Sequence, residues 1–115
     1  MMLPLPELLR VTDQWGALIV LTEEDVERIS AKRGDAIGSY LDEIRETLER
    51  PHVVYEGRHA DSKVFYGKDL LDGSPYRGCY LAVIVRYVNV PATIRTVYFP
   101  YDISGSLGAL LDIRR

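Results

Sequence analysis

The stretch Cys79–Phe99 constrains the fold of this chain more than any other part of the sequence. It reads C-Y-L-A-V-I-V-R-Y-V-N-V-P-A-T-I-R-T-V-Y-F and contains two strand-forming runs, Cys79–Val88 and Thr93–Phe99. The first run is apolar almost without alternation, which is typical of a central strand that is covered on both faces. Asn89 and Pro91 between the runs favour a turn. We therefore expect a hairpin at the centre of a sheet.

Two helices are predicted before this hairpin. Thr22 is placed to cap the first helix, Asp25 stands in capping-box position, and Lys32-Arg33-Gly34 is typical of a helix end. The second helix is expected over Asp35–Glu49, and Pro51 ends it because the residue before a proline avoids helical geometry. Its apolar residues recur at helical spacing and form one stripe. They are Ile37, Tyr40, Leu41, Ile44 and Leu48.

Shorter runs of strand-forming residues complete the predicted fold. His52–Glu56 and Lys63–Tyr66 are expected to be strands joined by a turn. Leu8–Asp13 and Ala17–Thr22 are compatible with an N-terminal hairpin, although the nearby prolines would also suit the first turn of a helix. Ala109–Ile113 is interpreted as a short tail. The prediction is a single α+β domain over residues 1–115, with two helices followed by a four-stranded antiparallel sheet, to which an N-terminal hairpin is an optional addition.

Composition limits the classes of function. A chain of 115 residues that is 47% hydrophobic and 27% charged is typical of one globular domain. Cys79 is the single cysteine, so an internal disulfide is impossible and a cytoplasmic location is expected. The opening segment Met1–Pro6 is too short and interrupted for a signal peptide or a membrane span. Carboxylates without His or Cys at ligand spacing predict neither a metal nor another cofactor.

Charge is unevenly distributed along the chain. Residues 22–50 hold nine acidic and five basic side chains, whereas residues 51–115 hold six acidic and eight basic ones. Arg86 stands inside an apolar run, and a charge there needs a partner, a strand end or a cleft. We weigh a structural ion pair against an anion site for this arginine. Tyrosines are frequent in the second half, and we interpret most of them as packing residues. They are Tyr55, Tyr66, Tyr80, Tyr87, Tyr98 and Tyr101.

The segment Thr22–Tyr55 resembles the phage-type branch of the barnase/EndoU/colicin/RelE-like nuclease superfamily. Within it, I-R-E-T-L-E-R-P-H-V-V at Ile44–Val54 is similar to the family pattern I-x-E-T-L-x-x-P-D-x-V. The following strands of the family have counterparts in order and spacing, and the similarity covers most of the chain, up to Ser104. These counterparts are Lys63–Tyr66, Tyr80–Val88 and Arg95–Tyr98.

This resemblance implies a toxin-like or phage-associated protein that binds RNA, with or without cleaving it, and needs no metal for cleavage. Arg28 and Arg33 stand where the family places two helix histidines, which supply acid and base most easily near neutral pH. Some RelE-like members are similar in using Lys, Arg and Tyr instead. The implied catalytic residues are Lys32, Arg33, Thr96 and Tyr98, and the implied substrate-binding residues are Arg28 and Arg86.

Two alternatives to an RNA-binding protein remain open, and no membrane partner is expected. One is a non-catalytic protein-interaction module, immunity- or antitoxin-like, on the same fold. The other is a homo-oligomer that forms through an edge strand. Convergence of the basic residues on one surface would favour RNA, and their dispersal would favour the interaction module.

Overall fold

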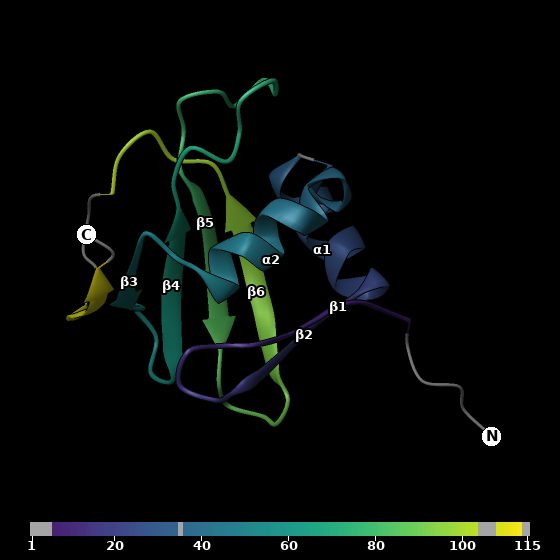
Figure 1. The fold of residues 1–115 in the computed structure, drawn as a ribbon. Helices are drawn as coiled ribbons and strands as arrows, with labels where there is room; N and C mark the ends of the chain where they lie inside the picture. Colours follow the sequence, from purple (N-terminus) through teal and green to yellow (C-terminus); the bar gives the residue numbers. More distant parts are fainter. Residues whose placement is uncertain (1–5, 35, 104–107, 114–115) are drawn as a thin grey trace.

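The computed structural model describes residues 6–34, 36–103 and 108–113, without the side chain of Arg33. Figure 1 shows two short α-helices packed beside a twisted sheet. The strands are β1 (Glu7–Thr12), β2 (Leu18–Thr22), β3 (Val53–Glu56), β4 (Ser62–Gly67), β5 (Leu81–Arg86), β6 (Ala92–Tyr98) and β7 (Leu110–Ile113). The helices are α1 (Glu23–Arg33), the 3₁₀-helix η1 (Ile37–Tyr40) and α2 (Leu41–Glu49).

The strands form one seven-stranded mixed sheet in the order β1-β2-β6-β5-β4-β3-β7. β2 runs parallel to β6, and the other neighbours are antiparallel. The predicted four-stranded antiparallel sheet after two helices is therefore wrong. The N-terminal hairpin β1–β2 is present and joins the sheet through β6, and the tail that we interpreted as unpaired forms β7 against β3. The predicted α+β class is correct only as a coarse description, because strands dominate the fold.

The two missed pairings have weak local signals. β2 contacts β6 through only two residue pairs, Ile19 with Ala92 and Val20 with Thr93, and the partners are far apart in the chain. β7 is four residues long, too short for an alternating pattern to show. The predicted second helix is also shorter than expected, because η1 precedes α2; its predicted first residue, Asp35, lies outside the described residues.

The ends of α1 follow the predicted capping chemistry. Thr22 Oγ1 accepts a hydrogen bond of 3.1 Å from the Asp25 backbone N–H, and Asp25 Oδ2 accepts one of 3.0 Å from the Thr22 backbone N–H. This reciprocal pair is the predicted capping box. At the other end, Gly34 takes a left-handed conformation with φ of 76° and donates its N–H to the Ser30 carbonyl. Residues without a side chain take that conformation most easily, so glycine ends the helix.

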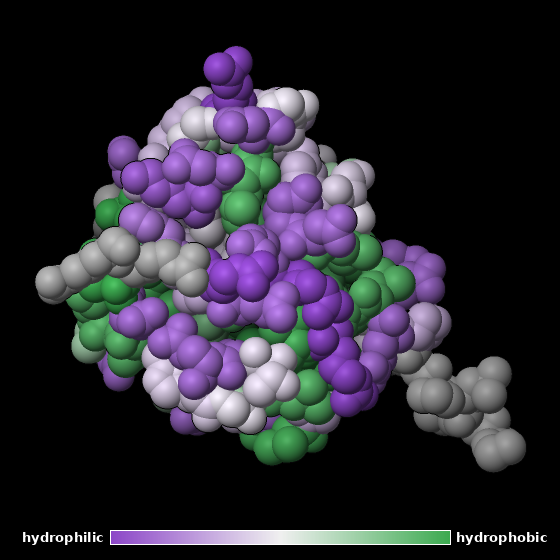
Figure 2. Space-filling view, in the orientation of Figure 1, coloured by the Kyte–Doolittle hydropathy of each residue, from purple (hydrophilic) through white to green (hydrophobic). Residues whose placement is uncertain are grey.

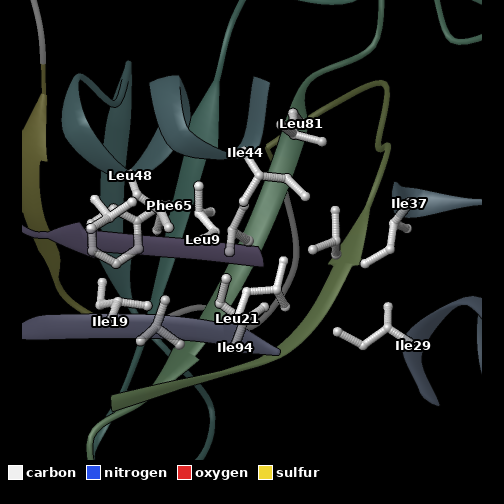
Figure 3. Close-up of a cluster of buried hydrophobic side chains, with 14 of the residues drawn as sticks. Leu9, Ile19, Leu21, Ile29, Ile37, Ile44, Leu48, Phe65, Leu81 and Ile94 are labelled. Carbon is white, nitrogen blue, oxygen red and sulfur yellow. The ribbon is translucent and has the colours of Figure 1, made fainter. Parts of the chain in front are cut away.

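The main hydrophobic core lies on one face of β3–β6. Ile44 and Leu48 of α2 are fully buried there, as the predicted stripe required. Leu9 and Leu21 of the β1–β2 hairpin belong to the same cluster. Figure 3 shows these side chains gathered between α2, the hairpin and the strands, and Figure 1 shows α2 crossing one half of the face and the hairpin crossing the other. Helix and hairpin therefore share the covering of this face.

The tip of the β1–β2 hairpin is tied to the sheet by polar contacts. Asp13 is buried; its Oδ1 accepts the backbone N–H groups of Trp15 and Ala17 at 2.9 Å, and its Oδ2 accepts the Tyr87 hydroxyl at 2.8 Å. Lys63 Nζ lies 3.8 Å from the Trp15 ring centroid and 4.6 Å from that of Tyr87, within cation–π range. Burial, followed by the hydrogen bond to Asp13, raises the pKa of Tyr87. The hairpin is thus held at its tip as well as along β2.

The side that carries the helices is largely hydrophilic. Figure 2 shows broad purple areas on it, separated by smaller green ones. Among the described residues, no helix has both the length and the apolar character needed to cross a membrane.

We expect Ile44→Ala to lower the free energy of unfolding by about 2–5 kcal/mol, because the substitution leaves a cavity under α2. Urea denaturation monitored by circular dichroism measures the change. Val88→Ala is the matched control: Val88 is 57% exposed, so its loss should change stability by less than about 0.5 kcal/mol. Equal midpoints for the two variants would contradict the assignment of Ile44 to the core.

Candidate functional site

Among the described residues, neither an α-helix nor the hairpin contributes to the cluster on the other face of β3–β6. We call this surface the open face. It carries a second, smaller hydrophobic cluster that is formed by the strands and the segments flanking them. The buried members are Val53, Val64, Tyr66 and Ala82, and the partly buried members are Tyr55, Tyr80, Ile84, Tyr98 and Ile103. On this face of the central strand β5, Ala82 is fully buried and Ile84 is half-buried, so the strand is covered by side chains of the cluster and, among the described residues, by neither an α-helix nor the hairpin.

Strand register arranges the open face in three rows. The first row contains Ile113, Val53, Tyr66, Ala82 and Tyr98. The second contains Leu110, Tyr55, Val64, Ile84 and Thr96. The third contains Ser62, Arg86 and Thr93. Arg86 is the single charged residue in these three rows, which are otherwise apolar, aromatic or hydroxyl-bearing. Arg95, which the irregularity of β6 leaves out of the rows, is exposed next to Thr96.

Tyr66 is the centre of the aromatic cluster and is 1% exposed. Tyr55 and Tyr80 each approach its ring edge-on with centroids 6.3 Å apart, which is a favourable geometry for aromatic pairs. The hydroxyls of Tyr66 and Tyr98 lie 3.4 Å apart. His52 extends the cluster by stacking on Tyr80 at 6.2 Å. The rings therefore bury one another on a sheet face to which, among the described residues, neither an α-helix nor the hairpin contributes.

The environment of Tyr66 disfavours the ionised form of its phenol. Burial, followed by the hydrogen bond with Tyr98, raises the pKa of the Tyr66 phenol above its ordinary value. A tyrosine phenol is protonated at neutral pH without any shift, and the raised pKa extends the protonated state further into alkaline solution. Tyr66 is thus a hydrogen-bonding and packing group there, not a general base.

Arg86 is the last residue of β5 and is half-buried. Its Nε is buried without a hydrogen-bond partner, and no described residue forms an ion pair with it. Ser62, its neighbour on β4, donates its hydroxyl to the His59 carbonyl at 2.6 Å instead. The structural ion pair that we weighed for Arg86 is therefore not formed within the described part of the chain.

Arg28 has a structural role on the other side of β6. Its guanidinium donates to the carbonyls of Ile94 at 3.1 Å and Arg95 at 3.0 Å, and pairs with Asp25 at 3.3 Å. β2 pairs with β6 only at Ala92 and Thr93, so these two carbonyls belong to the part of β6 that β2 leaves unpaired. Arg28 therefore supplies hydrogen bonds that a neighbouring strand would otherwise provide.

The six predicted site residues are divided between two sides of the sheet. Arg86, Thr96 and Tyr98 come together on the open face through strand register. Arg28 and the exposed Lys32 lie on α1, whose buried Ile29 packs into the opposite core. Arg33 ends α1, and its side chain lies outside the description.

Other basic residues are also dispersed. Lys63 packs over Trp15 under the hairpin, and Arg95 is exposed at the irregularity of β6. Among the residues that the structure describes, the basic side chains do not converge on one surface, which is the arrangement that would have favoured RNA. Within the described residues, no group of three His, Cys, Asp or Glu side chains could hold a metal ion.

The tyrosines Tyr55, Tyr66, Tyr80 and Tyr98 pack against one another, as the sequence predicted for most tyrosines of the second half. Sequence reasoning did not show that they gather on one face of the sheet. The signal that could have shown this was the pairing of the strands, which brings Tyr55 and Tyr66 onto one face together with Tyr98.

Comparisons with known proteins add no identity. No protein-family model matches the chain, and neither the curated proteins nor the solved structures contain a match. The resemblance to the RelE-like nuclease superfamily stays a prediction.

We expect Arg28→Gln to lower the free energy of unfolding by about 1–2 kcal/mol, because two β6 carbonyls lose their charged donor. Lys32→Gln removes an equal charge from the exposed surface of the same helix and should change stability by less than about 0.5 kcal/mol. Thermal and urea unfolding of both variants measure the difference. A neutral Arg28→Gln would contradict the structural role of Arg28.

Stability should decline in alkaline solution. Tyrosine in the unfolded chain ionises near pH 10, whereas the raised pKa of Tyr66 keeps the folded chain protonated. As pH rises above about 10, the unfolded state loses its proton first, so unfolding becomes easier. Tyr66→Phe removes this contribution, whereas Tyr87 keeps its own. The urea midpoint of the variant should therefore change less between pH 8 and pH 10.5 than that of the parent protein. An identical pH dependence of the urea midpoint in both proteins would contradict the raised pKa of Tyr66.

Proposed function

We propose that this protein is a non-catalytic interaction module that binds a partner protein through its open face. The observation that supports this most is the composition of the three rows, which combine tyrosines and aliphatic residues with one arginine. Protein interfaces are enriched in tyrosine and arginine and depleted in lysine, aspartate and glutamate. None of these three charged types occurs in the rows; serine and alanine, which interfaces also deplete, are present as the buried Ser62 and Ala82.

Exposed apolar residues extend the same surface towards the sheet edge. Leu110 and Ile113 of β7 are 49% and 47% exposed, and register places them at the ends of the two aromatic rows. Val53, Val64, Tyr66 and Ala82 in the centre of these rows are buried, so the exposed apolar surface lies at the β7 edge, where it is a sign of an interaction site. Tyrosine rings suit such a site, because they supply contact area with few rotatable bonds.

The distribution of polar groups supports binding over catalysis. A 2′-hydroxyl cleavage needs a base, an acid and charge stabilisation around one phosphate. The described candidates for these roles lie on two sides of β6, and Arg28 is engaged with backbone carbonyls. Nucleic-acid affinity comes mostly from several cations along the backbone, whereas the rows of the open face offer one. RNA cleavage remains what the family resemblance predicts, and the experiment below includes it as an outcome.

Photo-crosslinking from the open face tests the proposal. p-Azidophenylalanine replaces Tyr55 in one variant. In the control it replaces Tyr40, which packs against the main core on the helix-bearing side and contacts Tyr76 and Phe99. Irradiation in an extract of the native host should give a protease-sensitive adduct of one size from position 55 and none from position 40. Introducing Tyr98→Asp into the position-55 variant should remove that adduct by placing a charge in the apolar face.

The alternative outcome is equally specific. An adduct from position 55 that resists protease and disappears with ribonuclease would replace the protein partner with RNA. Incubation of the purified chain with single-stranded RNA in EDTA then tests cleavage. Intact RNA is the expected result, and a cyclic-phosphate product would overturn the non-catalytic role.

A further inference from the structure

Arg86, the charged residue of the three rows, has a guanidinium without hydrogen-bond acceptors among the described residues. It makes no hydrogen bond and no ion pair with any described residue, and its Nε is buried. The two terminal guanidinium nitrogens are not enclosed in this way, and the residue as a whole is half-buried. The open side of the guanidinium is therefore its end, where two parallel N–H groups are available.

The neighbours of Arg86 offer no negative charge. Register places Ser62 and Thr93 on either side of it, and Ile84 precedes it by one position on the same face. The Ser62 hydroxyl donates to the His59 carbonyl, and Nε of Arg86 has no hydrogen-bond partner among the described residues. No acid occurs in the three rows, so a negatively charged acceptor for the guanidinium has to come from outside these rows.

We infer that the partner presents a carboxylate to Arg86, beside an apolar or aromatic side chain that packs near Ile84. This inference rests on the proposed function and specifies the chemistry of the partner. A partly desolvated guanidinium without an acceptor is unfavourable, and a planar carboxylate matches its two end-on donors. The apolar neighbour follows from the composition of the rows.

A carboxylate fits this position better than a phosphate. A single arginine balances one negative charge, whereas phosphates are usually held by several donors or cations. The chain also carries a net charge of −3, which opposes a polyanion. Charge complementarity thus favours an acidic protein segment.

The experiment uses N-acetyl-L-phenylalanine as the probe, because it joins one carboxylate to one aromatic ring. Its carboxamide is the matched control, since it differs only in the charge. The Nε–H signal of Arg86 in ¹H–¹⁵N spectra is the readout, assigned by its loss in Arg86→Lys. We expect this signal to shift on titration with the carboxylate, with an affinity about tenfold higher than for the amide.

Three variants sharpen the result. Arg86→Gln should bind carboxylate and amide equally, as followed by the backbone signals of Ile84 and Thr96. Arg86→Lys should keep only part of the preference, because an ammonium lacks the planar pair of donors. Arg95→Gln removes an exposed arginine of the same sheet and should leave the preference unchanged.

Several outcomes would overturn the inference. If carboxylate and amide bind equally to the parent protein, Arg86 does not recognise the charge, while apolar docking on the open face still stands. A larger Arg86 shift with inorganic phosphate than with the probe would assign the site to phosphate. If the Nε–H signal of Arg86 does not shift at about 50 mM of either compound, a carboxylate site is also rejected. The crosslinking experiment would then still test whether a partner protein binds the open face.

Discussion

The limited reach of α2 determines how this sheet is covered. Nine helical residues span roughly 14 Å, whereas a six-residue strand is about 20 Å long. Ile44 and Leu48 can therefore bury only part of one face of β3–β6. The β1–β2 hairpin folds over the remainder with Leu9 and Leu21, which explains why the N-terminal segment belongs to the core. With both elements used on one side, the other side is left to the tyrosines.

Local chemistry in the sequence predicted the local structure well. The Thr22–Asp25 capping box and the stripe through Ile44 and Leu48 depend on residues a few positions apart, and both are present. The central hairpin is also present, as β5 and β6. The topology was not predictable in the same way, because the parallel contact of β2 with β6 depends on two pairs of residues from distant parts of the chain. β7 was too short to identify from its own pattern.

The candidate site shows the same division between local and long-range information. Arg86, Thr96 and Tyr98 were singled out from two adjacent strands, and antiparallel register brings them onto one face. Arg28 of α1 was expected to join them, but its position depends on where β2 separates from β6. At that point Arg28 finds two unpaired carbonyls and binds them. The burial of Tyr66 likewise depends on three segments at once, so no single stretch of sequence reveals it.

The tie between the hairpin tip and the end of β5 has a consequence for biosynthesis. The hairpin leaves the ribosome well before the groups that hold it, Tyr87 and the strand β6. Until then Leu9 and Leu21 have no complete core to enter. Long-range contacts of this kind slow folding, and exposed apolar hairpins favour aggregation. A nascent chain that pauses before Tyr87 is therefore the form of this protein that most needs protection by chaperones.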